Sequence, residues 1–208
     1  MKPADQLDAG LAELVLSLPS AAPARMIRYL ELLQKWNQVY NLTAIRDLPS
    51  MVSQHLLDSL SVLPHLPVAG SLADIGSGAG LPGIPLALAR PQLEVTLVET
   101  VSKKASFLQQ AKTELELTNV SIHCGRVEAW ATTQVFNALI SRAFSDLATF
   151  LRLAGHLLGV GGRLFAMKGA LTQHELDEVP PGWALLGTPQ LHVPGLAAQR
   201  HLIILERQ

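Results

Sequence analysis

Residues 73–83 read ADIGSGAGLPG, with three glycines at alternate positions and a fourth after a proline. A glycine-rich turn that follows a strand lets the backbone approach a ligand closely. Such turns hold dinucleotides, phosphates or S-adenosylmethionine, so this stretch alone predicts a ligand-binding turn and leaves the ligand open.

Strands and helices alternate from residue 71 onward. Helices are expected between successive strands, and a final pair of strands is expected at 183–193 and 200–207. This alternation predicts an α/β fold with a doubly wound, mainly parallel sheet, in which ligands bind beyond the carboxyl ends of the strands. The expected strands are 71–76, 93–99, 120–124, 136–142 and 162–168, and the expected helices are 82–90, 102–117 and 146–158.

The first 66 residues have helical periodicity instead. Apolar residues recur at helical spacing in 4–16 and 24–39, and a third helix is expected at 51–63. We therefore expect an N-terminal helical cap (1–66) followed by a Rossmann-like α/β domain (67–208).

Composition limits the class of protein. The chain has 208 residues, is 49% apolar and carries a net charge of −1, which predicts a folded protein with a sizeable core. The most apolar window, 71–89, contains Asp74, two prolines and four glycines, so a membrane helix is not expected. The acidic N-terminus does not resemble a secretory signal, and we expect a cytoplasmic protein. The near-neutral charge means that any RNA binding needs a local basic patch.

The glycine loop fits one ligand better than the others. Gly78, Gly80 and Gly83 satisfy the dinucleotide pattern G-x-G-x-x-G, but Gly76 already ends the strand, so the turn is longer than in that pattern. The longer turn leaves space for an amino-acid moiety. A Walker A loop is excluded because no Lys-Ser or Lys-Thr follows the glycines.

Glu99 ends the next strand, 19 residues after Gly80. A carboxylate there can accept hydrogen bonds from both hydroxyls of a ribose, in NAD or in S-adenosylmethionine. The other interpretation is an acid at a helix N-terminus beside Ser102, which is expected to cap that helix.

Further candidates follow the later strands. Val127 is placed to cover one face of an adenine, and Glu128 to meet its polar edge. Arg142 and Lys168 come just past consecutive strands, so both are expected to face the ligand cleft and to orient a substrate. Three glycines at 159, 161 and 162 are expected to break the preceding helix and lead into the next strand.

Several spaced motifs together resemble one family. They are NLTAIR (41–46), HLLDSL (55–60), DIGSGAGLPGIPLA (74–87), SKKASFL (102–108), SRAF (141–144) and MKG (167–169). This combination, from about Trp36 to Gly169, is similar to the bacterial 16S ribosomal RNA (guanine-N7) methyltransferases, also called glucose-inhibited division protein B.

The resemblance implies a Rossmann-like methyltransferase fold, S-adenosylmethionine as methyl donor and no metal. The substrate it implies is a guanine in the decoding-region hairpin of 16S rRNA, within the small ribosomal subunit or its assembly intermediate, and a monomer is expected. The donor-binding positions carried over by the matching motifs are Gly76, Leu81, Val127, Glu128 and Arg142. Gly78 and Glu99 complete the expected donor site.

The expected chemistry agrees with what the sequence lacks. Guanine N7 has a lone pair and no proton, so its methylation needs alignment and no general base. Cys124 has no partner motif and is expected to be inert core, and Phe144 is expected either to stack on a base or to lie in the core. His55 and Asp58 lack a third metal ligand, so packing and capping roles are expected for them.

Other functions stay open at this point. One is a methyltransferase that acts on a small molecule or protein, another is an NAD-dependent oxidoreductase, and a third is a non-catalytic RNA-binding module. An RNA-facing patch in the helical cap would draw on Arg25, Arg28, Lys35 and Arg46.

Overall fold

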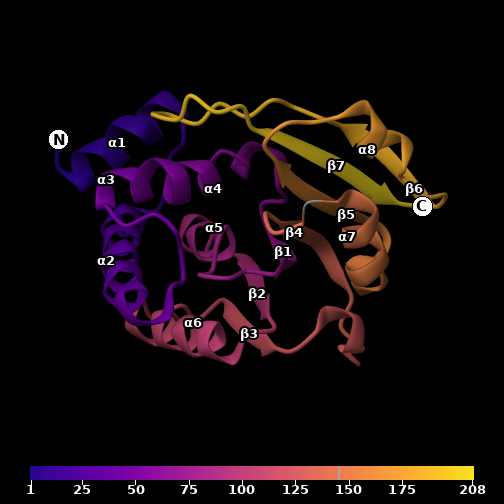
Figure 1. The fold of residues 1–208 in the computed structure, drawn as a ribbon, viewed down its shortest axis with the longest axis horizontal. Coiled ribbons are helices and arrows are strands. Elements are labelled where there is room, and N and C mark those ends of the chain that lie inside the picture. The colour runs from indigo at the N-terminus through magenta and orange to yellow at the C-terminus, as the bar shows by residue number, and fades with distance from the viewer. Residues whose placement is uncertain (145) are drawn as a thin grey trace.

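The computed structural model describes residues 1–144 and 146–208. Its centre is a seven-stranded sheet in the order β3-β2-β1-β4-β5-β7-β6, flanked by helices on both faces (Figure 1). β1 to β5 are parallel, and β7 runs antiparallel to both β5 and β6. The strands are β1 (Gly70–Ile75), β2 (Leu93–Glu99), β3 (Val120–Cys124), β4 (Phe136–Ser141), β5 (Leu158–Lys168), β6 (Trp183–Gly187) and β7 (His201–Arg207).

The order of winding reverses beside β1. The chain goes from β1 outward to β2 and β3, then returns to place β4 on the other side of β1. The carboxyl ends of β1 and β4 therefore flank the switch point, where ligands bind in open α/β sheets. The predicted fold class is confirmed.

Alternation along the strands creates two apolar cores. Leu72 and Leu97 belong to the first, which α5 (Gly83–Ala89) and α6 (Ser102–Glu114) cover. Ile75 and Val98 belong to the second, which α7 (Leu147–Ala154) covers, with the 3-10 turns η3 (Val127–Ala129) and η4 (Gly155–Leu157) beside it. Successive strand residues point to opposite faces, so both faces of the sheet are buried.

The first core continues into the N-terminal helices. Tyr29 of α2 (Ala22–Tyr40) is fully buried in it, and so is Leu7 of α1 (Pro3–Glu13). The apolar side chains that recur at helical spacing in the first 66 residues thus pack into the first core, on one face of the sheet.

The third N-terminal helix is not the regular helix that periodicity predicts. It consists of α3 (Leu48–Met51), a π-helical segment η1 (Val52–Leu57) and α4 (Asp58–Leu60), with a 3-10 turn η2 (Leu63–His65) after it. A π-helical segment carries one more residue per hydrogen-bonded ring than an α-helix, which apolar periodicity does not reveal.

Two further local predictions are wrong. Ser102 is the first residue of α6 and Val101 precedes it, so Ser102 does not cap the helix. The glycines at 159, 161 and 162 lie inside β5, opposite a shift of register between Phe136 and Ala138. Glycines inside a strand often mark such an irregularity.

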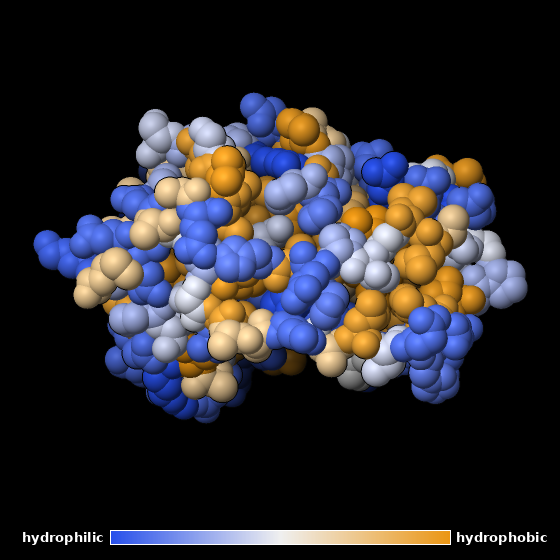
Figure 2. All heavy atoms as spheres, turned by 90° about the horizontal axis from the view of Figure 1, so that it is seen from above, coloured by the Kyte–Doolittle hydropathy of each residue, from blue (hydrophilic) through white to orange (hydrophobic). Residues whose placement is uncertain are grey.

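The short helix α8 (Gln173–Asp177) lies between β5 and β6, and a long connection then joins β6 to β7. Residues 188–200, called the strap here, run along the top of the molecule to α1 and back (Figure 1). Leu191 and Val193 of the strap are buried in the first core, and His192 Nε2 lies 2.5 Å from Glu13 Oε1 of α1. From above, polar residues cover much of the upper face, and apolar residues gather in patches between them (Figure 2). Among the described residues, no helix combines the length and apolar character needed to cross a membrane.

Candidate functional site

The backbone of the glycine loop after β1 is held by hydrogen bonds to β2. The N–H groups of Gly76 and Ser77 donate to the carbonyl of Val98, at 2.9 and 3.0 Å. Gly76 has φ +72°, and a Cβ there would lie 3.0 Å from the Cβ of Ala143, so a side chain is disfavoured on both grounds. At the far end of the loop, Oδ2 of the buried Asp74 accepts from the N–H of Gly83 at 2.8 Å.

Glu99 connects this loop to the turn after β2. Its Oε2 accepts from the N–H of Gly78 and its Oε1 from the N–H of Val101, both at 2.8 Å. The side chain is 5% exposed. Oε1 also accepts from the hydroxyl of Thr100 at 3.4 Å. Oε2 can accept a second hydrogen bond, and contact with a ribose stays a prediction.

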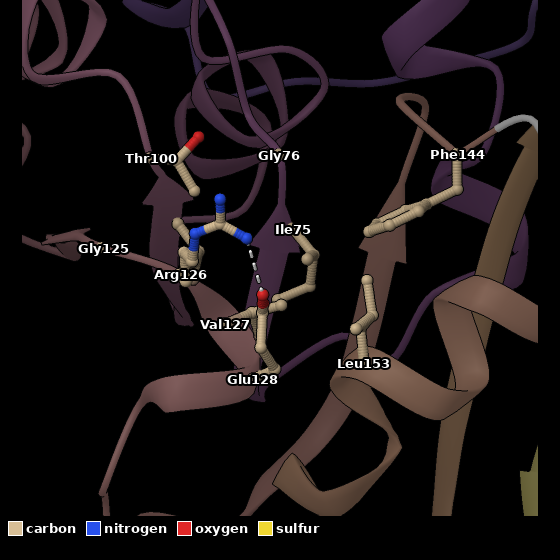
Figure 3. Close-up of a pocket in the computed structure, with 10 residues that line it drawn as sticks. Ile75, Gly76, Thr100, Gly125, Arg126, Val127, Glu128, Phe144 and Leu153 are labelled. Carbon is tan, nitrogen blue, oxygen red and sulfur yellow. Dashed lines mark hydrogen bonds and ion pairs between the residues drawn. The ribbon is translucent and has the colours of Figure 1, made fainter.

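An apolar cavity of about 330 Å³ lies beside the loop. Ile75, Phe144 and Leu153 face it from β1, the segment after β4, and α7, while Val127 closes it from η3 (Figure 3). The exposed Glu128 lies at its edge, paired with Arg126 at 3.2 Å (Figure 3). A hydrogen bond from its own backbone N–H, and then one from Arg126, lower the pKa of Glu128. The full lining is Ile75, Gly76, Val98, Thr100, Gly125, Arg126, Val127, Glu128, Phe144 and Leu153.

A second, more polar cavity of about 190 Å³ is also lined by Gly76. Gly78, Leu81 and Arg142 line it, together with His55 of the cap. Gly76 lines both cavities, so an apolar and a polar compartment meet at the glycine loop. The predicted donor-site residues other than Glu99 line one or both compartments.

A third cavity, of about 360 Å³, is called the arginine cavity here. It is lined by Arg142, Lys168 and Arg200, and by Ile45, Gln54, His55, Asp58, Met167 and Gly169. The structure thus brings the two predicted cations, Arg142 and Lys168, together at the ends of β4 and β5. Their role in orienting a substrate stays a prediction.

Asp58 is the centre of the charges around this cavity. Its Oδ2 accepts from Arg142 Nη1 and its Oδ1 from Arg200 Nε, both at 2.9 Å. Its side chain is 1% exposed, and the two arginine side chains are 28% and 27% exposed. Lys168 Nζ pairs with Glu175 Oε1 at 2.6 Å.

His55 lines both the polar compartment and the arginine cavity. Its Nδ1 lies 3.1 Å from the carbonyl of Gln54, and its Nε2 lies 2.9 Å from the hydroxyl of Thr43. A carbonyl can only accept, so Nδ1 carries the proton and Nε2 accepts from Thr43. Burial, and then the charge of Arg142, lower the pKa of His55 to about 4, which keeps the ring neutral near pH 7.

Two residue-level expectations need correction, those for Asp58 and Cys124. Asp58 was expected to pack or cap but binds two arginines, because it lies buried between the ends of β4 and the strap. Cys124 was expected in the core but is exposed, because it ends the sheet's edge strand β3. Phe144 is half-buried and stacks on Phe150, with ring centroids 4.8 Å apart. Among the described residues, no group of three or more His, Cys, Asp or Glu side chains could hold a metal ion.

The expected basic patch in the cap stays a prediction, and two of its members contact the sheet domain. Arg25 donates to the carbonyls of Leu115 and Glu116, and Arg28 lies 3.9 Å from Glu114. Both arginines therefore contact the C-terminal end of α6 and the turn after it.

Arg200 was not predicted as a site residue, although the sequence carries a signal for it. It directly precedes β7, and β7 is antiparallel to β5. A strand that runs antiparallel to its neighbour begins at the sheet edge where that neighbour ends. Arg200 therefore lies at the carboxyl edge with Arg142 and Lys168.

Solved structures share this fold. An S-adenosylmethionine-dependent methyltransferase of unassigned role from Methanococcus maripaludis aligns with a TM-score of 0.59 over 86% of this chain and 91% of its own, at 15% identity. The S-adenosylmethionine-dependent methyltransferase SibL aligns with a TM-score of 0.60 over 86% of this chain and 68% of its own, also at 15% identity. The chain therefore has the Rossmann-like methyltransferase fold.

Sequence comparison identifies the family. The model of the GidB family, described as rRNA small subunit methyltransferase G, matches residues 23–203. The protein named ribosomal RNA small subunit methyltransferase G from Aromatoleum aromaticum is 56% identical, over 97% of each chain. The protein of the same name from Azoarcus sp. is 54% identical, over 98% of this chain and 96% of its own. This chain belongs to the rRNA small subunit methyltransferase G family.

Proposed function

We propose that this protein transfers a methyl group from S-adenosylmethionine to N7 of a guanine in 16S rRNA of the small ribosomal subunit. Membership of the family supports an rRNA substrate. The resemblance of the sequence motifs gives the finer expectation, which is N7 of guanine 527 in the decoding-region hairpin.

The two compartments at Gly76 fit the parts of the donor. The apolar cavity, with Ile75 and Val127 in its walls, suits an adenine ring. The polar cavity, with Gly78, Leu81 and Arg142, suits the charged amino-acid end. Glu99, the last residue of β2, is the candidate for the ribose, and Glu128 is the candidate for the polar edge of the adenine. The donor supplies an electrophilic methyl group on a sulfonium.

The observation that carries the N7 assignment is that the acid–base groups of the arginine cavity are already engaged. Asp58 uses both oxygens on arginines, and Lys168 is paired with Glu175. His55 has a partner on each ring nitrogen. Among the described residues, this cavity therefore offers no free base. Guanine N7 needs none, because it carries a lone pair and no proton, and the protein has only to hold it in line with the methyl group.

The acceptor base would approach between the arginine cavity and Phe144. Arg142, Phe144 and Lys168 line a further shallow cavity of about 340 Å³ there. An aromatic ring beside cationic side chains suits a base turned out of its stack, with the cations meeting RNA oxygens. A cation next to N7 would oppose the positive charge of the product, so Arg142 is expected to meet an oxygen and not N7 itself.

The test uses small subunits that lack the modification and radiolabelled S-adenosylmethionine. The labelled position is mapped by N7-selective strand cleavage. We expect label on one guanine of the decoding-region hairpin, and no label with Gly76→Asp, whose side chain would collide with Ala143. Label elsewhere in the RNA would reject the assigned atom, and donor binding without any RNA label would reject the rRNA substrate.

A further inference from the structure

The strongest unassigned feature of the molecule is the buried carboxylate of Asp58. It comes from the cap, directly after the π-helical segment, and meets one arginine from the end of β4 and one from the end of the strap. Arg142 and Arg200 thus reach the same carboxylate from segments far apart in the chain.

Each arginine is held in a defined direction. Arg142 Nη1 also donates to the carbonyl of Gln54 at 3.0 Å, and Arg200 Nη1 donates to the carbonyl of Gln199 at 3.0 Å. Within residues 1–144 and 146–208, Nη2 of either arginine has no hydrogen-bond partner. Both side chains line the arginine cavity and remain more than a quarter exposed, so their unused N–H groups are available to a ligand there.

We infer that Asp58 is a positioning residue for rRNA methylation, which fixes Arg142 and Arg200 as one pair so that they bind an oxygen of the substrate RNA. The shared chemistry is an accepting or anionic oxygen, from a phosphate or from the guanine carbonyl. The inference rests on rRNA methylation as the activity and is independent of which base atom is methylated.

The charge of Asp58 matters as well as its hydrogen bonds. Two guanidinium groups that face one small cavity repel each other unless a carboxylate lies between them. With Asp58 in place the trio keeps one net positive charge, enough to attract RNA. Methyl transfer moves positive charge from the sulfonium of the donor to the base. The carboxylate of Asp58 would lower the positive potential of the arginines near that base.

The first experiment measures kcat, KM for RNA and donor affinity for Asp58→Asn. We expect kcat/KM for RNA to fall about a hundredfold, because misplacement of orienting groups costs rates of that order. The matched control is Glu206→Gln, which breaks another arginine–carboxylate pair, with Arg163 at 3.2 Å, on the sheet away from the arginine cavity. It should leave kcat/KM unchanged. Activity of Asp58→Asn within threefold of the wild type would overturn the inference.

Single variants of Arg200 separate positioning from charge, and their comparison does not depend on Asp58→Asn folding. Arg200→Lys keeps the charge but loses the Nε–H that binds Asp58, so we expect it to lose about as much activity as Arg200→Gln. Adding Asp58→Asn to Arg200→Gln should give no larger loss than Asp58→Asn alone. Full activity of Arg200→Lys, or losses that multiply in the double variant, would show that Asp58 does not act through Arg200.

The salt dependence of RNA binding identifies the oxygen. If Arg200 binds a phosphate, Arg200→Gln lowers the log–log salt slope by about one; if it binds the guanine carbonyl, the slope stays the same while activity falls. Both results support the positioning role, whereas an unchanged slope with unchanged activity overturns it. Mapping the wild-type label in parallel tests the methylated atom separately from the role of Asp58. Label at another atom would reject the N7 assignment, but the activities of the Asp58 variant and the wild type could still be compared.

Discussion

Asp74 is a fully buried acidic residue whose pKa is raised. It lies fully buried beneath the glycine loop, where Gly83 donates to Oδ2, and Oδ1 has no partner among the described residues. Burial raises the pKa of its carboxyl group from an ordinary 3.8 to about 7, although the hydrogen bond from Gly83 and the charge of Arg142 oppose the increase. A raised folded-state pKa means that between about pH 4 and pH 7 the folded protein binds more protons than the unfolded chain. Stability from this group therefore falls as pH rises.

Asp74→Asn should remove that pH dependence. Relative to the wild type, the variant should gain about 2–4 kcal/mol in unfolding free energy between pH 4 and pH 8. Urea unfolding at several pH values measures the difference. Asp47→Asn is the control: Ser50 lowers the pKa of the exposed Asp47, so its carboxyl stays ionised from pH 5 upward and its difference from the wild type should stay constant there. Parallel stability curves for Asp74→Asn and the wild type would contradict the prediction.

At the scale of residues, the sequence predicted the positions that follow strands and missed the carboxylate that binds Arg142 and Arg200. Gly76, Val127 and Arg142 line the expected cavities because the carboxyl ends of parallel strands share one edge. Asp58 could not be placed this way, because its contact with Arg200 spans 142 residues and depends on how the cap meets the strap. A motif such as HLLDSL shows an acid among apolar residues but not its partner.

At the scale of elements, the strap carries a prediction of its own. Its two ends are joined by the N–H of Leu191 donating to the carbonyl of Arg200 at 2.7 Å. Leu191 is also 6% exposed and packs in the first core. Leu191→Ala should therefore cost about 2–4 kcal/mol of stability. It should also speed amide hydrogen exchange in residues 188–200 and lower methylation of RNA through the loosened Arg200.

Leu186→Ala is the matched control for the strap. Leu186 lies on β6 and is 48% exposed, so its truncation should change stability by less than about 1 kcal/mol and leave exchange in the strap unchanged. Equal exchange in Leu191→Ala and in the wild type would show that Leu191 does not anchor the strap.

Elements were predictable where local pattern decides them. β2 and β3 begin and end where their β-branched runs predict, and α2 extends a little beyond its expected ends. The π-helical segment and the glycines inside β5 were missed, because both depend on register with neighbouring segments. The same holds for the strap, whose path is set by the burial of Leu191 and Val193 in a distant core.

At the scale of the whole molecule, the sequence predicted a doubly wound sheet and a helical cap, but not how closely the two are joined. The first core contains side chains from both, and the hydroxyl of the buried Tyr29 donates to the carbonyl of Ala79 in the glycine loop at 2.7 Å. Loss of this contact would disturb cap and loop together. The division into domains at residue 66 stays a prediction, which unfolding can test.

Two tryptophans report on the two parts. Trp36 of α2 packs against Phe107, with ring centroids 5.7 Å apart, on the cap side. Trp183 of β6 packs against the second core, on the other face of the sheet. Variants that keep one of these tryptophans and carry phenylalanine at the others are unfolded in urea and followed by fluorescence, with far-UV circular dichroism as reference.

Because one core joins the cap to the sheet, we expect both fluorescence transitions to share their midpoint and slope with the circular dichroism, as one cooperative unit requires. As a control, the unfolding of the wild type and of each variant is compared by circular dichroism, which measures the stability lost through the substitutions. If the cap were a separate domain on a weak interface, the Trp36 transition would come at a lower urea concentration than the Trp183 transition. That result would also separate Asp58 from Arg142 before the sheet unfolds, and RNA methylation should then fail at urea concentrations where Trp183 is still native.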